Sequence, residues 1–97
     1  MIPGLGQGRI HLLGICGTGM ASLAGMLKEK GFTVSGSDQN TYPPMSEMLC
    51  ELGIDVRSPY GAKNVPSQTD LVVVGNAISR GNPELEEVLD RRLPYVS

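Results

Sequence analysis

The segment best suited to bind an anion is the glycine-rich turn Gly14-Ile15-Cys16-Gly17-Thr18-Gly19-Met20. An apolar run ends at this turn and a helical pattern begins there, so the turn is expected to lead from a strand into a helix. The first N–H groups of a helix lack acceptors and lie at the positive end of its dipole, and glycines let ligand oxygens approach the backbone. Because the turn contains no Lys or Arg, we expect its amides, assisted by the Thr18 hydroxyl, to hold a phosphate or diphosphate.

Two further interpretations of the turn stay open at this point. The glycines would also be explained by a tight turn that permits positive φ and close packing of helix on strand. The nucleotide class is open as well, because the dinucleotide fingerprint G-x-G-x-x-G, counted from Gly14, has Cys16 at its second glycine and Gly19 at its third. The Cβ of Cys16 would crowd a pyrophosphate, which disfavours a regulatory NAD(H)-binding domain without excluding it.

Asp38 is a candidate ligand for ribose. It lies at the end of the second expected strand, in Val34-Ser35-Gly36-Ser37-Asp38, and 19 residues after Gly19, about where nicotinamide-binding folds place the acid that binds ribose hydroxyls. The alternative is a turn residue that caps its own backbone. Together with the glycine turn, Asp38 favours a nucleotide of some kind.

The loop from Gly75 to Pro83 follows a second apolar run and supplies the remaining candidates, Asn76, Ala77 and Arg80. Arg80 would be the only cation near the glycine turn, able to form charge-assisted hydrogen bonds to phosphate or carboxylate. In the alternative interpretation, Arg80 is solvated and Asn76 only forms a turn.

Three other reactive side chains are assigned structural roles. His11 lies inside an apolar strand without an evident partner, where a hydrogen-bonded structural histidine is more common than a catalytic one. No paired base for Cys16 is evident, so we expect a small buried residue rather than a nucleophile. Cys50 falls off the apolar face of its helix and is expected to be a free thiol.

The elements that position these residues follow from apolar spacing. Strands are expected at four places before the C-terminus and again from Tyr95 onward; the four are Ile10–Ile15, Phe32–Gly36, Ile54–Arg57 and Leu71–Val74. Helices are expected over Met20–Leu27 and Met45–Leu52, and a third has Asn82 as its N-cap and Pro83 as its first residue. Residues 58–69 are predicted to be a loop or short irregular helix, and the methionines of the helices to fill the core.

Strands alternating with helices at this spacing predict an α/β fold, a Rossmann-like, doubly wound, mainly parallel five-stranded sheet in a single domain over residues 9–97. Residues 1–8 are expected to be a flexible lead-in. In a doubly wound sheet, the glycine turn and the loop after Val74 leave in opposite directions and bracket a crevice at the carboxyl ends of the strands.

Composition excludes several function classes. The 97 residues carry a net charge of -2, which provides no basic field for nucleic acid or an anionic membrane. No apolar run approaches the ~20 residues that cross a bilayer, and no signal peptide is evident. Two distant cysteines and one histidine suit a reducing compartment and form no metal motif. We expect a cytoplasmic protein that binds no metal.

The ordered motifs resemble the start of a Mur ligase. They are Arg9-Ile10-His11-Leu12-Leu13-Gly14-Ile15-Cys16-Gly17-Thr18-Gly19-Met20, Val34-Ser35-Gly36-Ser37-Asp38, Tyr42-Pro43-Pro44-Met45-Ser46 and Gly75-Asn76-Ala77-Ile78-Ser79-Arg80-Gly81-Asn82-Pro83. Within the family they are most similar to the murein peptide ligases, which join UDP-N-acetylmuramate to the recycled tripeptide L-alanyl-γ-D-glutamyl-meso-diaminopimelate. The related muramate-alanine ligases, the other alternative, usually have Gly in place of Cys16 and a Ser-Ser-Ala type sequence in place of Gly75-Asn76-Ala77.

The resemblance implies that this chain is the N-terminal, UDP-N-acetylmuramate-binding domain of a three-domain, ATP-dependent amide ligase of peptidoglycan recycling. In the full-length enzyme, ATP with Mg²⁺ would activate the muramate carboxylate for attack by the tripeptide amine. The chain has no G-x-x-x-x-G-K-[ST] motif, so we expect it to bind no ATP and to be inactive alone. By the same resemblance, the turn from Gly14 to Met20 takes the diphosphate, Ser37 and Asp38 the uridine end, and the segment 76–80 the sugar side.

Overall fold

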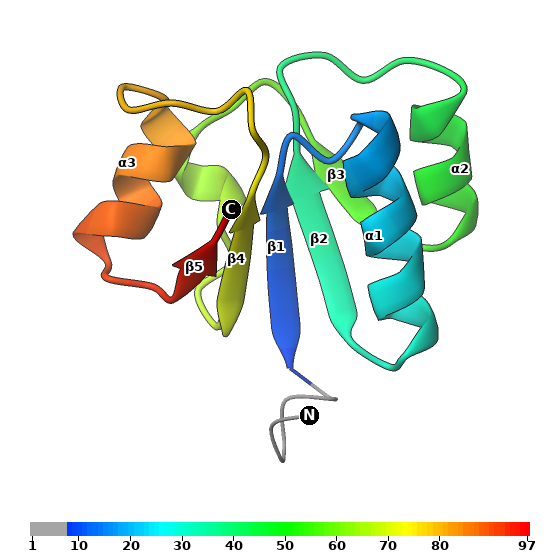
Figure 1. Cartoon of the computed structure of the whole chain (residues 1–97), viewed down its shortest axis with the longest axis horizontal. Helices are drawn as coiled ribbons and strands as arrows, with labels where there is room; N and C mark the ends of the chain where they lie inside the picture. The colour runs from blue at the N-terminus through cyan, green and yellow to red at the C-terminus, as the bar shows by residue number, and fades with distance from the viewer. Residues whose placement is uncertain (1–7) are drawn as a thin grey trace.

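The computed structural model describes residues 8–97, and its centre is a sheet of five parallel strands (Figure 1). The strands are β1 (Arg9–Leu13), β2 (Thr33–Ser37), β3 (Asp55–Arg57), β4 (Leu71–Val74) and β5 (Tyr95–Val96). Their spatial order is β3-β2-β1-β4-β5, and every neighbouring pair is parallel. The predicted doubly wound α/β fold is therefore confirmed.

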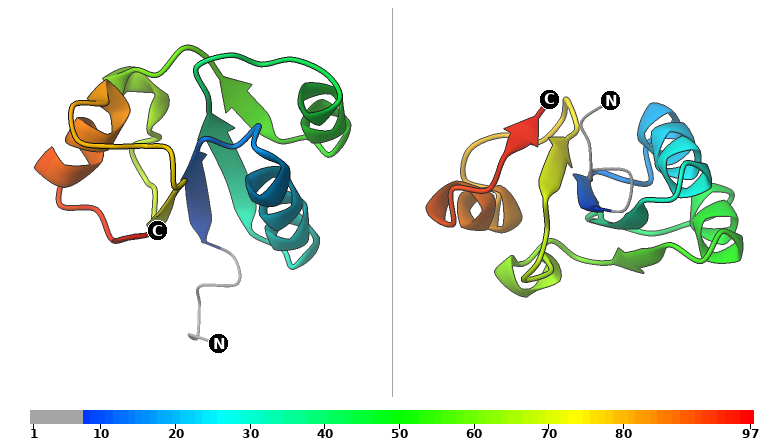
Figure 2. Two further views of the ribbon diagram at one scale, coloured as in Figure 1. Left: turned by 45° about the horizontal axis from the view of Figure 1, so that its top comes forward. Right: turned by 90° about the horizontal axis from the view of Figure 1, so that it is seen from below.

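Helices cover both faces of the sheet. They are α1 (Thr18–Glu29), α2 (Met45–Glu51), α3 (Pro83–Asp90) and the short 3₁₀ helix η2 (Ala62–Asn64). Helices α1 and α2 lie on one face, and α3 and η2 lie on the other (Figure 2). The 3₁₀ helix falls inside residues 58–69, where the sequence predicts a loop or short irregular helix.

Local sequence signals explain where the elements begin and end. Gly14, Gly31 and Gly53 have φ values of 87°, 100° and 76°, which L side chains rarely adopt, and they end β1, α1 and α2 respectively. The side chain of Asn82 accepts hydrogen bonds from the N–H groups of Glu84 and Leu85 at 2.9 and 3.2 Å, and Pro83 is the first residue of α3. The predicted N-cap of α3 is thus confirmed.

Ile15 departs from the expected strand. Because Gly14 turns the chain, β1 ends at Leu13 and Ile15 lies in the turn, fully buried. Its side chain packs on Gly36 of β2, where an added Cβ would lie 2.5 Å from Ile15 Cδ1 and 2.7 Å from the Leu12 carbonyl oxygen. The absence of a side chain at Gly36 therefore lets the turn close over the sheet.

The core consists of two layers separated by the sheet. One packs β1 and β2 against α1 and α2, and the other packs β1 and β4 against α3. Met20, Met45 and Met48 contribute to the first layer as predicted. Met26 does not, because 54% of it is exposed on the outer side of α1.

Residues 1–7, where most of the lead-in was predicted, lie outside the described residues. Gly8 is buried, and its carbonyl oxygen accepts a hydrogen bond from Thr33 N–H at 3.0 Å. Among residues 8–97, no helix combines the length and the apolar character needed to cross a membrane.

Candidate ligand site

A hollow of about 230 Å³ opens at the carboxyl ends of the strands, where the chain leaves β1 toward one face and β4 toward the other (Figure 1). The register explains the convergence, because Leu13 of β1 pairs with Ser37 of β2 and Val74 of β4, so all three strands end at one level. The segments that follow these three strands and β3 line the hollow; the lining residues are Gly14, Cys16, Gly17, Asp38, Tyr42, Tyr60, Ala77 and Ile78. This is the crevice expected at the switch point of an open α/β sheet.

Most amides of the glycine turn are already bonded within the protein. The N–H groups of Gly14 and Ile15 donate to the Ser37 carbonyl oxygen at 2.8 and 3.1 Å. Gly17 N–H donates to the Gly14 carbonyl oxygen at 3.2 Å, and Cys16 N–H donates to Asp38 Oδ2 at 2.9 Å. These four donors hold the turn in shape and leave nothing for a ligand.

The donors left over belong to the first turn of α1. Among residues 8–97, the N–H groups of Thr18, Gly19 and Met20 find no acceptor, and no side chain caps the helix. Gly17, the N-cap residue, lines the hollow, whereas Thr18, Gly19 and Met20 follow it in the chain and are not among the lining residues. Of the amides in the turn, only those of its last three residues lack an acceptor among the described residues, so these three are the candidates for binding an anion.

Asp38 has a structural role and also faces the hollow. Its Oδ1 accepts from Gln39 N–H at 2.8 Å, and its Oδ2 from Cys16 N–H. The first of these bonds is the local cap that the sequence left open, and the second ties β2 to the glycine turn. Each carboxylate oxygen can accept a second hydrogen bond, so Asp38 can still receive a hydroxyl donor from the hollow.

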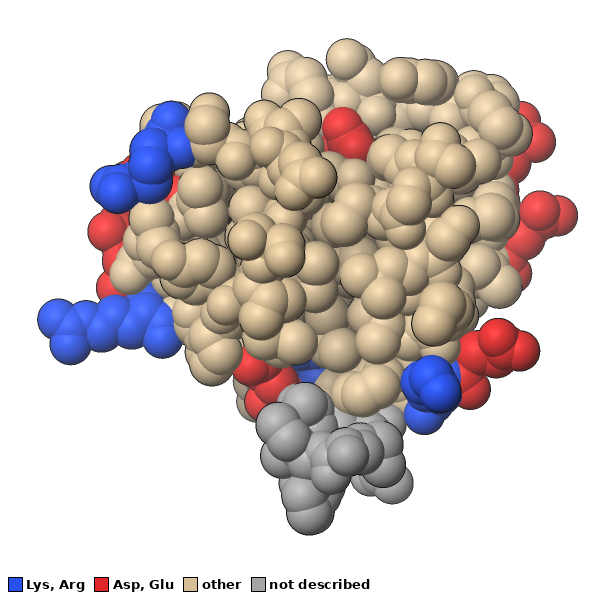
Figure 3. All heavy atoms as spheres, in the orientation of Figure 1, with Lys and Arg blue, Asp and Glu red and all other residues tan. Residues whose placement is uncertain are grey.

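Ser37 and Arg80 do not line the hollow. Ser37 is fully buried, and its hydroxyl donates to Glu84 of α3 beneath the turn. The Arg80 side chain is 78% exposed, and its Nε donates to Glu86 Oε2 at 2.9 Å. Asn76 is exposed, whereas its neighbour Ala77 does line the hollow. No lining residue among those described is a Lys or Arg, and most charges on the face in Figure 3 lie at its margins.

Tyr60 was missed by the sequence analysis. It follows β3 in the segment predicted as loop, and its hydroxyl would lie 3.8 Å from a Cβ added at Gly14. Burial, followed by the nearby carboxylates of Asp38 and Glu84, raises the pKa of Tyr60 to about 12. The hydroxyl therefore keeps its proton and can donate to a ligand. Its position just past the end of a strand is the signal that could have identified it.

His11 has partners that the sequence did not reveal. The ring is buried between Ser35 Oγ, 2.8 Å from Nδ1, and Glu84 Oε2, 2.5 Å from Nε2. Glu84 lies 73 residues away in sequence, which is why no partner was evident. The structural interpretation of His11 accounts for these contacts without a ligand.

The two cysteines are free thiols, with Cys50 exposed and Cys16 half-buried beside the hollow. Burial and then the Asp38 carboxylate raise the pKa of the Cys16 thiol. A thiol with a raised pKa is a poor nucleophile, which agrees with the expected non-catalytic role.

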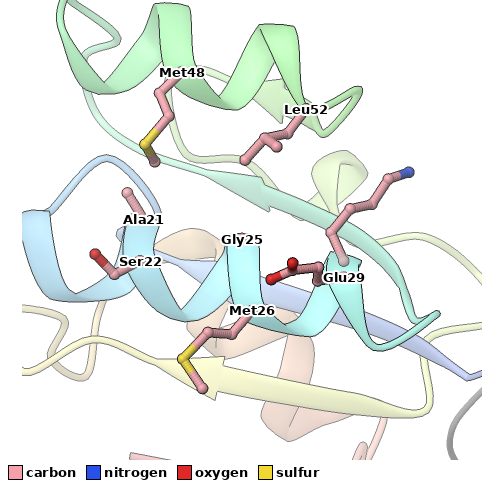
Figure 4. Close-up of a pocket in the computed structure, with 8 residues that line it drawn as sticks. Ala21, Ser22, Gly25, Met26, Glu29, Met48 and Leu52 are labelled. Atoms are coloured by element: carbon pink, nitrogen blue, oxygen red, sulfur yellow. The ribbon is translucent and has the colours of Figure 1, made fainter.

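A larger, mainly apolar groove of about 510 Å³ lies between α1 and α2 (Figure 4). Met48 of α2 and Leu52, which directly follows that helix, face Ala21 and Gly25 of α1 across the groove. None of the residues that line this groove follows the end of a strand or supplies one of the three acceptor-free amides. We therefore place the candidate nucleotide site at the smaller hollow.

The described residues do not provide a metal site. Within the range 8–97, no three His, Cys, Asp or Glu side chains are grouped so as to hold an ion. Asp38 is the only such carboxylate among the lining residues of the hollow, and one of its oxygens is bonded to the glycine turn. We therefore derive no step through Mg²⁺ or ATP from these residues.

Comparisons with known proteins agree with this architecture. The family model described as "Mur ligase family, catalytic domain" matches residues 9–97. The UDP-N-acetylmuramate--L-alanyl-gamma-D-glutamyl-meso-2,6-diaminoheptandioate ligase of Escherichia coli K12 is 51% identical over 89 residues, which are 92% of this chain and 20% of that protein. The UDP-N-acetylmuramate--L-alanine ligase of Psychrobacter cryohalolentis is 39% identical over 87 residues, 90% of this chain and 18% of that protein.

Among solved structures, a murein peptide ligase from Psychrobacter arcticus 273-4 superposes with a TM-score of 0.87 at 48% identity. The similarity covers 92% of this chain and 18% of that one. The chain therefore spans about a fifth of the length of the relatives it matches.

Proposed function

Because the chain belongs to the Mur ligase family, we propose that it is the N-terminal domain of an ATP-dependent amide ligase and binds UDP-N-acetylmuramate at the hollow described above. The observation that carries the proposal is the set of three acceptor-free amides, Thr18 to Met20, which directly follow Gly17 in the lining of a hollow at the switch point of the sheet. Such amides favour an anionic group, and a diphosphate supplies one.

The parts of the ligand are proposed to lie on different segments. The diphosphate lies over the first turn of α1, with Gly17 leaving space for it. The uridine end lies toward Asp38 and the Tyr60 hydroxyl, and the sugar lies toward the segment 76–80. Arg80 would bind the ligand by leaving its ion pair with Glu86 and pairing with a phosphate or carboxylate of the ligand. This change of partner is feasible because the Arg80–Glu86 pair is exposed and therefore weak.

The size of the hollow predicts weak binding by this chain alone. At about 230 Å³ it is smaller than the ~300–1,000 Å³ of sites that enclose a whole small ligand, so it holds only part of a UDP-sugar. We expect UDP to bind in the sub-millimolar to millimolar range, worth roughly 4 to 5 kcal/mol. The rest of the ligand would be covered by other parts of the ligase.

For the full-length enzyme, we propose attachment of the recycled murein tripeptide to UDP-N-acetylmuramate in the cytoplasm. The chain is 51% identical to a ligase named for that peptide and 39% identical to one named for L-alanine, which favours the former. ATP and Mg²⁺ are proposed to bind outside the described residues, so this chain should be inactive alone.

Calorimetric titration and thermal unfolding of the 97-residue chain test the proposal. We expect UDP-N-acetylmuramate and UDP to bind saturably and to raise Tm with ligand concentration, and NADH at equal concentration to have no effect. Stabilisation by NADH alone would identify the alternative NAD(H)-binding domain. A folded sample that responds to none of the three ligands would refute the nucleotide site and favour a partner-binding module.

A further inference from the structure

A cluster of buried polar side chains lies directly beneath the hollow, where β1 and β2 meet the first turn of α3. At its centre is Glu84, which is 0% exposed. His11 and Ser37, on the two strands, are also buried, at 1% and 0% exposed. A carboxylate in such a position is strongly disfavoured unless hydrogen-bond donors surround it.

Four donors surround the Glu84 carboxylate, two on each oxygen. Oε2 accepts from His11 Nε2 at 2.5 Å and from the Ser37 hydroxyl. Oε1 accepts from Gly61 N–H at 3.2 Å and from Asn64 Nδ2 at 2.9 Å. Burial alone would raise the pKa of Glu84, but these four hydrogen bonds outweigh it and hold the pKa below its ordinary value. Glu84 is therefore ionised and fully satisfied as an acceptor.

These donors belong to segments that shape the hollow. Ser37 provides, through its carbonyl oxygen, the acceptor for Gly14 and Ile15 N–H in the glycine turn. Gly61 directly follows Tyr60, and Asn64 Nδ2 also donates to the Pro59 carbonyl oxygen at 2.8 Å. The residues on both sides of Tyr60 are thus tied to Glu84. Gly61 N–H donates to its carboxylate directly, and the Pro59 carbonyl oxygen is linked to it through Asn64.

Glu84 is also linked to the loop after β4, through its backbone N–H in α3. Asn82, at the end of the loop that contributes Ala77 and Ile78 to the hollow, accepts from the backbone N–H of Glu84 at 2.9 Å. Glu84 thereby connects three segments that shape the hollow: the loop after β4, the glycine turn and the segment around Tyr60.

We propose that Glu84 is the positioning residue of the ligand site, because its carboxylate holds the glycine turn and the Tyr60 segment in the arrangement that the ligand meets. This inference rests on the proposed function for the identity of the ligand. An apolar side chain could fill the same volume, but it would leave the Gly61 N–H without its acceptor and the Asn64 amide with only the Pro59 carbonyl oxygen. The hollow would then exist in only a fraction of molecules, and the apparent affinity would fall in proportion.

The first test compares Glu84→Ala with Val88→Ala. Val88 is also on α3 and fully buried, but it packs in the apolar layer and is not bonded to the hollow. Below the unfolding transition, we expect Glu84→Ala to weaken UDP-N-acetylmuramate binding by about tenfold, whereas Val88→Ala lowers Tm but changes affinity by less than about twofold. Equal affinities for the two folded variants would overturn the proposal.

The conservative variant Glu84→Gln should restore binding. Its carbonyl oxygen can accept from Gly61 and Asn64, while its amide nitrogen faces His11 and Ser37. Ser37 can accept through its hydroxyl oxygen, and His11 can accept at Nε2 if its proton moves to Nδ1 and is donated to Ser35. Because the chain contains one histidine, a ¹⁵N spectrum of its ring reports this shift directly.

Amide hydrogen exchange needs no ligand and therefore separates this proposal from the proposed function. Loss of the Glu84 carboxylate should speed amide hydrogen exchange at Gly61 and leave exchange in β4 unchanged at equal stability. If Glu84→Ala does not fold, Asn64→Ala removes only the bonds to Oε1 and to Pro59, and it should weaken binding by several-fold. Unchanged Gly61 exchange, or full affinity in Asn64→Ala, would refute the positioning role. Changed exchange in a chain that binds no UDP-sugar would refute only the proposed function.

Discussion

At Gly17, two possible reasons for a glycine can be distinguished: the shape of the turn and the access of a ligand. Its backbone angles, φ -64° and ψ 148°, are open to any residue, and an added Cβ would come no closer than 3.5 Å to the Gly14 carbonyl oxygen. Neither backbone strain nor packing therefore requires glycine here. Gly17 lines the hollow and immediately precedes the acceptor-free amides, so we propose that its role is to leave space for the ligand.

We predict that Gly17→Val folds and binds UDP-N-acetylmuramate at least about tenfold more weakly, a loss of ~1.4 kcal/mol or more, because the branched side chain occupies the space of the diphosphate. Valine is a poor N-cap, so stability should also fall by about 1 kcal/mol. Titration of the folded variant measures the effect. Gly25→Ala is the control, because Gly25 lies in α1 outside the lining of the hollow and its Cβ would make only an ordinary contact with Leu52 at 3.5 Å. Wild-type affinity in Gly17→Val would remove the turn from the site.

The sequence indicated several of the residues that line the hollow, but it did not indicate the hydrogen bonds that these residues form. Of the predicted site residues, Gly14, Cys16, Gly17, Asp38 and Ala77 line the hollow, and their contact with a ligand stays a prediction. Which amides stay free depends on Ser37, the last residue of β2, and on Asp38, which follows it, so patterns local to the turn did not show it. Glu84 was not singled out in the sequence analysis. Its four donors come from segments that only the fold brings together.

At the scale of elements, two glycines on the α1 side of the sheet should respond in opposite ways to alanine. Gly36 in β2 lies under the glycine turn, and its Cβ would meet the Leu12 carbonyl oxygen at 2.7 Å and Ile15 Cβ at 2.8 Å. These atoms cannot rotate away. Gly25 lies in α1, where a Cβ would meet only the flexible end of Leu52 at 3.5 Å, an ordinary contact.

We predict that Gly36→Ala destabilises the fold by about 1 to 3 kcal/mol or more through overpacking. Gly25→Ala should stabilise it by about 0.5 to 1 kcal/mol, because alanine is the better helix former. Urea unfolding of both variants measures the difference. A Gly36→Ala variant as stable as the wild type would mean that the turn does not close over β2 as described.

Elements were easier to predict than their ends. Helix α3 was placed correctly because Asn82, Pro83 and the apolar spacing all agree on it. The strand β1 was extended to Ile15 because hydrophobicity alone does not distinguish a buried strand residue from a buried turn residue. Positive φ at Gly14 makes that distinction, and only the structure supplies it.

At the scale of the whole molecule, one carboxylate links the two halves of the sheet. Glu84, on the helix that packs over β4, bonds to side chains on β1 and β2 and to the segment after β3. Because its pKa is lowered in the folded state, the folded chain binds fewer protons than the unfolded chain near the ordinary pKa of 4.5. Its contribution to stability is therefore complete above that value and is lost as pH falls through the folded pKa.

We predict that the free energy of unfolding, measured in urea, falls steeply as pH drops below about 4.5 and that Glu84→Gln makes this dependence much shallower. Glu86 is the matched control: its pKa is also lowered, by Arg80 and then by Gly81 N–H, but the pair is at the surface. Solvent and salt screen that pair, so Glu86→Gln should keep nearly the whole slope. If Glu84→Gln and the wild type lose stability in parallel, the acid sensitivity arises elsewhere, and the buried carboxylate does not hold the two halves of the sheet together.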